Sequence, residues 1–153
     1  MGSKENLKLI RARYEAVNSH DFEKFQSFYD KSISWGDPHL ARAVKGPVAV
    51  RRRLESLTAA FPDLKWELGR IFSEGEHVCA EFTFTGTHRG KLDNRGRTIS
   101  ASNQKIRIPA VGVYTVRGNK IVDSKIYYNF EDLKRQPSTA KAGARKTSSK
   151  RKR

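Results

Sequence analysis

The spacing of the apolar residues changes once along this chain, near residue 64, and that change constrains the fold more than any other feature. Before it, apolar residues recur every three or four positions, as on the buried stripe of a helix. After it, they alternate with polar residues, as on half-buried strands. Helices followed by a run of long strands indicate an α+β domain, with the helices packed on one face of a curved, mainly antiparallel sheet.

Three helices are predicted in the first part. The first spans residues 4–18, the second begins at Phe22, and Gly46-Pro47 opens the third, which Pro62 stops. Between the second and third, "SISWGDPHL" (32–40) predicts a short strand that runs into a turn. The third helix carries a buried stripe made of Val50, Leu54, Leu57 and Phe61.

Four long strands are predicted in the second part, at 65–73, 78–87 and 105–116 and within 120–132. Gly118-Asn119 is typical of a two-residue hairpin turn between the last two. The segment 88–103 between the second and third strands is polar and is predicted to be partly ordered. In the last strand, Tyr127 and Asn129 share one face and Tyr128 takes the other.

Basic residues concentrate at the end of the chain. Residues 134–153 contain nine Lys or Arg and no acid, so they supply nine of the net charge of +15. This segment has no hydrophobic period, and we expect it to be a disordered tail that follows a folded domain at 1–133. Phosphate contacts would make it bind nucleic acid non-specifically, through Lys141, Arg145, Lys146, Lys150, Arg151, Lys152 and Arg153. The other interpretation is a solubilising tail.

Several classes of protein are disfavoured. No run of about 18 apolar residues is present, so no membrane span is predicted. The N-terminus lacks the apolar region of a signal peptide, and we expect a cytoplasmic protein, with a nucleoid or nuclear location as the alternative that the tail allows. The four histidines lack metal-ligand spacing, and no metal site is predicted. Cys79 lies within a strand pattern and is interpreted as a buried thiol.

Three segments carry a resemblance to a known family. The pieces "AAFPDLKW", "FTFTGTHRG" and the glycine turn followed by "KIV" are together similar to the SnoaL-like polyketide cyclases, or ester cyclases, of the nuclear transport factor two-like superfamily. The resemblance covers roughly residues 5–130. It implies a cone-shaped α+β barrel around one deep pocket, a small hydrophobic ligand, frequent homodimers, and acid–base chemistry without a metal or cofactor.

The resemblance also implies where that chemistry would lie. Relatives carry an aspartate near the end of the last strand, and the aligned residue here is Asn129. An amide cannot take a proton from carbon as a carboxylate can, so enzymatic activity is left open. Relatives often carry histidine-aspartate-proline where this chain has Gly36-Asp37-Pro38, with His39 after the proline.

The candidate catalytic residues are therefore Asp37, Tyr127 and Asn129, and the candidate ligand-binding residues are Tyr14, Trp35, His39, Tyr127 and Asn129. Asp37 would handle a proton, while Tyr127 and Asn129 would hold the polar end of the ligand. Each has a plainer interpretation, as a turn residue, a strand-end polar group or a core aromatic. Two functions remain: a ligand-binding cyclase-, isomerase- or hydrolase-type protein, and a non-catalytic ligand-binding or dimerisation module tethered to nucleic acid by its tail.

Overall fold

The computed structural model describes residues 3–38, 42–94, 97–129 and 131–132. The expected α+β order is confirmed. The helices are α1 (Ser3–Asn18), α2 (Phe22–Ser27) and α3 (Pro47–Ala60). The strands are β1 (Tyr29–Gly36), β2 (Val44–Lys45), β3 (Lys65–Glu74), β4 (His77–Thr87), β5 (Leu92–Asn94), β6 (Arg97–Ile99), β7 (Lys105–Arg117) and β8 (Lys120–Tyr128). The predicted basic tail lies outside the described residues.

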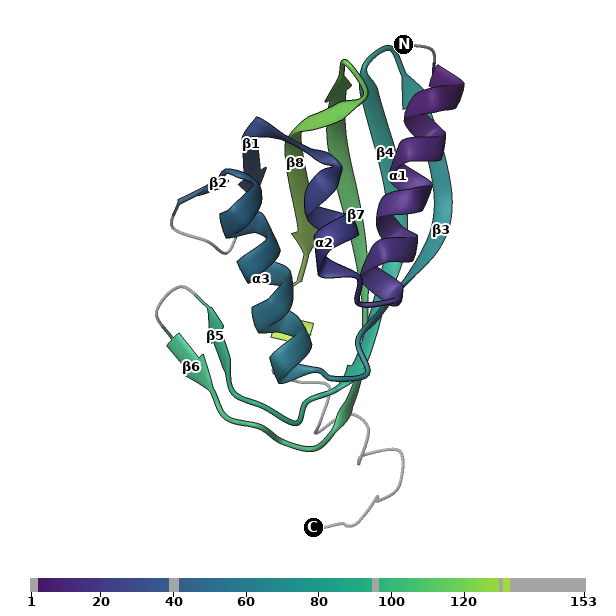
Figure 1. Ribbon diagram of the computed structural model, residues 1–153. Helices are drawn as coiled ribbons and strands as arrows, with labels where there is room; N and C mark the ends of the chain where they lie inside the picture. The colour runs from purple at the N-terminus through teal and green to yellow at the C-terminus, as the bar shows by residue number, and fades with distance from the viewer. Residues whose placement is uncertain (1–2, 39–41, 95–96, 130, 133–153) are drawn as a thin grey trace.

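The main sheet has six strands in the order β2-β1-β8-β7-β4-β3. All neighbours are antiparallel except β1 and β8, which are parallel. Figure 1 shows the three helices on the same side of this curved sheet, while β5 and β6 form a separate hairpin next to the end of α3. The segment predicted to be partly ordered thus contains a short hairpin of its own.

The turn between β7 and β8 has the predicted form. Gly118 and Asn119 both have positive φ angles, 54° and 62°. Two successive positive φ angles give the primed turn whose twist matches that of the flanking strands. This turn sets the register of β8, the strand that carries Tyr127 and Asn129.

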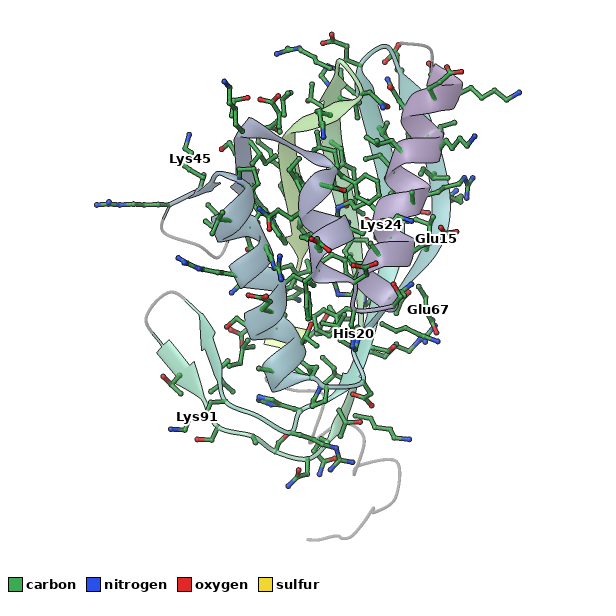
Figure 2. All side chains as sticks on the ribbon, in the orientation of Figure 1. Glu15, His20, Lys24, Lys45, Glu67 and Lys91 are labelled. Carbon is green, nitrogen blue, oxygen red and sulfur yellow. The ribbon has the colours of Figure 1, made fainter. Side chains whose placement is uncertain are left out.

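Apolar and charged side chains separate as expected for a sheet with one covered face. Val78, Ala80 and Phe82 of β4 are buried beneath the helices. Figure 2 shows Lys45 and Lys91 extending away from the protein, and both are exposed. Among the described helices, none has the length and apolar character that crossing a membrane requires.

One charged residue is an exception to this separation. Arg13 of α1 is fully buried, and its Nε donates a hydrogen bond of 2.7 Å to the hydroxyl of Tyr29. Its guanidinium lies 4.8–5.4 Å from the centroids of four aromatic rings, those of Tyr14, Phe25, Trp66 and Tyr114. Cation–π attraction replaces a carboxylate partner, and it is strongest where water is excluded.

The space for this cluster comes from a glycine in β7. A Cβ atom at Gly112 would collide with the ring and hydroxyl of Tyr114. With glycine there, the Tyr114 ring lies over the strand, and its hydroxyl forms a 2.6 Å hydrogen bond with the hydroxyl of Tyr14. Burial raises the pKa of the Tyr14 phenol to about 12, so it is protonated at neutral pH.

The hydrogen bond between Arg13 and Tyr29 predicts coupled stabilities. Tyr29→Phe should lower the free energy of unfolding by about 2 kcal/mol, because a buried, charged donor loses its acceptor. In an Arg13→Met background, the same substitution should cost much less, since no guanidinium remains. Urea denaturation of the four proteins completes the double-mutant cycle. Equal costs in both backgrounds would contradict the coupling.

Candidate functional site

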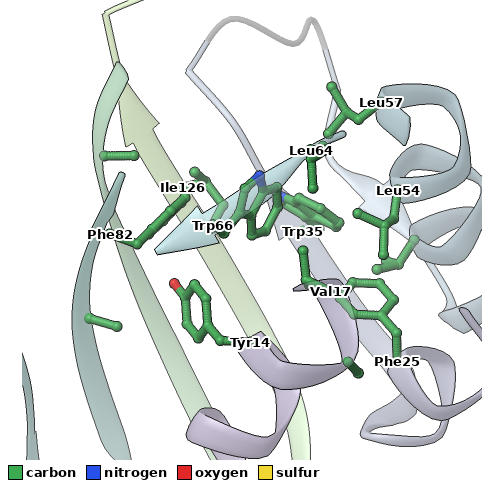
Figure 3. Close-up of a cluster of buried hydrophobic side chains, with 14 of the residues drawn as sticks. Tyr14, Val17, Phe25, Trp35, Leu54, Leu57, Leu64, Trp66, Phe82 and Ile126 are labelled. Carbon is green, nitrogen blue, oxygen red and sulfur yellow. The ribbon is translucent and has the colours of Figure 1, made fainter. Parts of the chain in front are cut away.

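An apolar pocket lies between α3 and the inner face of the sheet. Its apolar walls are made of Leu57, Phe61, Phe82, Phe84, Leu92, Ile108, Ala110 and Ile126. Trp35 and Trp66 also line it, and Figure 3 shows these two side chains lying next to each other among the buried residues. The free space is about 50 Å³, smaller than the roughly 150 Å³ of a cavity that holds a benzene ring, so a ring-sized ligand requires the wall side chains to move apart.

Two opposite charges meet in this pocket. Asp37 follows β1 and Arg53 lies on α3, and their side chains are only 5% and 13% exposed. The distance between Arg53 Nη2 and Asp37 Oδ2 is 3.9 Å, which is longer than a hydrogen bond but short enough for strong Coulombic attraction. The guanidinium therefore offsets part of the cost of burying the carboxylate.

Tyr128 supplies a third polar group. It is the last residue of β8, it is partly buried, and it lines the same pocket as Asp37. A phenol can donate a hydrogen bond to a ligand oxygen. The pocket thus combines a carboxylate, a guanidinium and a hydroxyl with mostly aromatic and aliphatic walls, a composition typical of small-molecule sites.

The wall around Phe61 is fixed by the segment "GTHRG". His88 stacks on Phe61 with ring centroids 4.9 Å apart. The next two residues bind the end of α3, because Arg89 N and Gly90 N both donate to Ala60 O. Asp63 accepts hydrogen bonds from the backbone and hydroxyl of Thr87 at 2.7 and 2.8 Å. Two of the three segments that carry the family resemblance therefore contact each other here.

The structure places the predicted site residues in different regions. Asp37 and Trp35 line the pocket together. Tyr14 is buried in the core beside Arg13 and is not part of the pocket wall. His39 lies outside the described residues.

The prediction that Tyr127 and Asn129 line this pocket is corrected. Tyr127 is 47% exposed and belongs to a separate depression on the other face of the sheet, with Thr83 and Val111. Asn129 is exposed, and its Oδ1 accepts a hydrogen bond from Glu131 N at 3.0 Å. The residues of β8 that reach the pocket are Ile126 and Tyr128.

Asn129 was expected in the pocket because it aligns with the aspartate of relatives, and β8 itself contains a bulge before that position. Ile121 pairs with Val116, but Asp123 pairs with Thr115, so Val122 is an extra residue in the ladder. An extra residue reverses which face the following side chains take. Beyond the bulge the even-numbered residues are the buried ones.

Arg53 is a site residue that the sequence analysis did not select. It lies three residues after Val50 and four before Leu57, so it falls on the buried stripe of α3. This position on the buried stripe was the sequence feature that could have identified Arg53 as a site residue. Its neighbours differ: Arg52 is exposed, and Arg51 pairs with Glu55 at 3.0 Å.

The comparisons with known proteins agree with this fold. The family model described as SnoaL-like polyketide cyclase matches residues 8–137. No curated protein matches the sequence.

Three solved structures are similar in fold. A protein from Jannaschia sp. CCS1, described as a SnoaL-like polyketide cyclase, has a TM-score of 0.78 at 16% identity, covering 89% of this chain and 93% of its own. AclR from Streptomyces galilaeus, described as a hydroxylase, has a TM-score of 0.76 at 22% identity, with 90% and 83% covered. An LEH-like epoxide hydrolase of M. tuberculosis has a TM-score of 0.70 at 15% identity, with 93% and 96% covered. At these identities, the likeness establishes the fold alone.

The burial of His88 predicts a pH dependence. Burial lowers the pKa of its imidazole, because the charged form is disfavoured there. The imidazole binds a proton more tightly in the unfolded chain than in the folded protein. Its contribution to the free energy of unfolding is therefore complete above the unfolded pKa of about 6.5, and it declines as the pH falls towards the lower pKa of the folded state.

We therefore expect His88→Gln to reduce the loss of unfolding free energy between pH 7.5 and pH 5.5, measured by urea denaturation. His77→Gln is the matched control, because His77 is exposed. The same loss in His88→Gln as in the unsubstituted protein would contradict this account.

Proposed function

Because the chain belongs to the SnoaL-like polyketide cyclase family, we propose that its apolar pocket binds a small hydrophobic molecule and transfers a proton to or from it. The observation that carries the proposal is the Asp37 carboxylate, which is 5% exposed and lies beside Arg53 in a mostly apolar wall. Buried charges are costly, so a carboxylate that lines a cavity is a candidate for acid–base chemistry.

The roles follow from the chemistry of the groups present. Asp37 accepts a proton from carbon or from a water molecule, as general bases do. Arg53 holds the carboxylate by charge, and the Tyr128 hydroxyl donates to an oxygen on which negative charge develops. None of these steps needs a cofactor. The reaction class is a cyclase-, isomerase- or hydrolase-type proton transfer.

The structural neighbours support a pocket function without fixing the reaction. They include a protein described as a polyketide cyclase, one described as a hydroxylase and an epoxide hydrolase. The same fold thus accompanies different chemistry in different members, and function depends on the groups in each pocket. In this chain those groups are Asp37, Arg53 and Tyr128.

The proposal predicts that Asp37→Asn greatly slows turnover and leaves the fold intact. Thermal-shift screening of the full chain against small cyclic ketones, esters and epoxides identifies binders, and mass spectrometry of the incubated compounds identifies turnover. The rate should fall about 100-fold or more, the usual contribution of a positioned general base. Asp123→Asn, a substitution outside the pocket wall, should retain the rate. A fully active Asp37→Asn protein would refute the role of Asp37.

A second candidate function rests on the sequence of the tail. Nine Lys or Arg residues and no acid between 134 and 153 favour a non-catalytic module that is tethered to nucleic acid. Such binding arises from counterion release at phosphates and depends on charge rather than on base sequence. Nucleic-acid binding by the tail would be compatible with a pocket that binds a ligand without catalysing a reaction.

This candidate predicts a steep dependence on salt. Binding of the full chain to a random DNA duplex should weaken by roughly 1,000-fold between 50 and 200 mM salt. Replacing the seven basic residues from Lys141 to Arg153 with glutamine should remove the binding. The control replaces Lys4, Lys8 and Arg11, which are exposed on α1, with glutamine. This control should change the affinity for DNA little. Equal effects of the two sets would contradict a tail-specific contact.

A further inference from the structure

One hydrogen-bond donor in the pocket wall has no acceptor. Trp66 is 2% exposed, and its Nε1 has no hydrogen-bond partner among the residues that the structure describes. An indole nitrogen can only donate, and leaving a buried donor unpaired is costly enough to be rare. Because Trp66 lines the cavity, an acceptor supplied by a bound molecule can satisfy it.

The indole is held in place and cannot easily turn to find a partner. The backbone of Trp66 is fixed by the side chain of Asn18 at the end of α1, which accepts from Trp66 N at 2.7 Å and donates to Trp66 O at 3.0 Å. The ring packs on Phe82 with centroids 5.1 Å apart, and on Tyr14 and Phe84 at 6.3 and 6.2 Å. Contacts on several sides therefore fix the position of the N–H group.

The charge of Arg13 strengthens this donor. Its guanidinium carbon lies 5.4 Å from the centroid of the Trp66 ring, and the whole side chain is buried. An arginine keeps its charge in proteins. A positive charge packed against the indole makes this part of the wall attractive to an oxygen that carries partial negative charge, and the low local dielectric strengthens the effect.

We propose that Trp66 Nε1 is a binding subsite for a carbonyl oxygen of the pocket ligand. The ligand is then a small cyclic or aryl carbonyl compound whose apolar body contacts the aromatic walls and whose oxygen accepts from Trp66. Arg13 acts through Trp66 as a positioning residue and does not touch the ligand. The inference rests on the proposed function, because it requires that the pocket takes a ligand.

The test compares two compounds that differ in one oxygen. Acetophenone and ethylbenzene have the same ring and chain length, but only acetophenone has a carbonyl. The protein contains two tryptophans, so the indole N–H region of its ¹H–¹⁵N spectrum holds two signals. The variants Trp66→Phe and Trp35→Phe each remove one signal, and either variant alone assigns both.

The expected result has two parts. Acetophenone moves the Trp66 indole proton downfield in a saturable titration of the full-length protein, and ethylbenzene binds without that shift. Trp66→Phe reduces the preference for acetophenone over ethylbenzene about tenfold, the effect of leaving a ligand acceptor without its donor. His77→Gln, a substitution at an exposed residue outside the pocket wall, leaves the preference unchanged.

Two results would overturn the inference, and they have different consequences for the proposed function. If acetophenone binds and moves the Trp66 indole proton no more than ethylbenzene does, the subsite is wrong while the pocket stands as a ligand site. If neither these two compounds nor the cyclic ketones, esters and epoxides of the screen give saturable shifts at any pocket residue, both the subsite and the proposed function fail.

Discussion

The guanidinium of Arg13 is buried completely, and it is surrounded by aromatic rings and the Tyr29 hydroxyl. This cation determines much of what packs around it. The rings face it because their electron-rich surfaces attract a positive charge, and a glycine at position 112 of β7 makes the space that the Tyr114 ring needs. The cluster joins α1, β1, β3 and β7, elements that are far apart in the sequence. It therefore fixes helix α1 on the inner face of the sheet and, through Trp66, one wall of the pocket.

The pocket contains two kinds of electrostatic feature that differ in sign. Asp37 contributes a negative charge that Arg53 offsets at 3.9 Å. Trp66 contributes an unpaired N–H group with the cation of Arg13 behind its ring. A ligand that carries a carbonyl oxygen and an acidic C–H or a reactive electrophilic centre would suit both features. Apolar walls exclude water and strengthen each interaction, so a few polar groups suffice to orient a small molecule.

The sequence was sufficient to predict the fold, because hydrophobic spacing and turn residues are local signals. The first helix was expected over 4–18 and spans Ser3–Asn18, and the Gly118-Asn119 turn formed as expected. The site was harder to predict. Asn129 was assigned to the pocket from its aligned position in the family, whereas the alternation of exposed Lys125 and buried Ile126 places odd-numbered residues of this segment on the other face. The contacts of Arg13 and Arg53 likewise depend on packing between distant segments, although Arg53 does fall on the buried stripe of its helix.

The position of Asn129 bears on where any proton transfer takes place. The family resemblance implies a carboxylate at that position, but here the amide is exposed and binds the backbone of Glu131. Among the described residues that line the pocket, Asp37 is the one carboxylate, and it follows β1 rather than belonging to β8. Since β1 and β8 are neighbouring parallel strands, Asp37, which follows β1, and Tyr128, the last residue of β8, lie at the same ends of these strands and line one cavity. Under the proposed function, the carboxylate that follows the neighbouring strand serves the same pocket, and no aspartate at position 129 is needed.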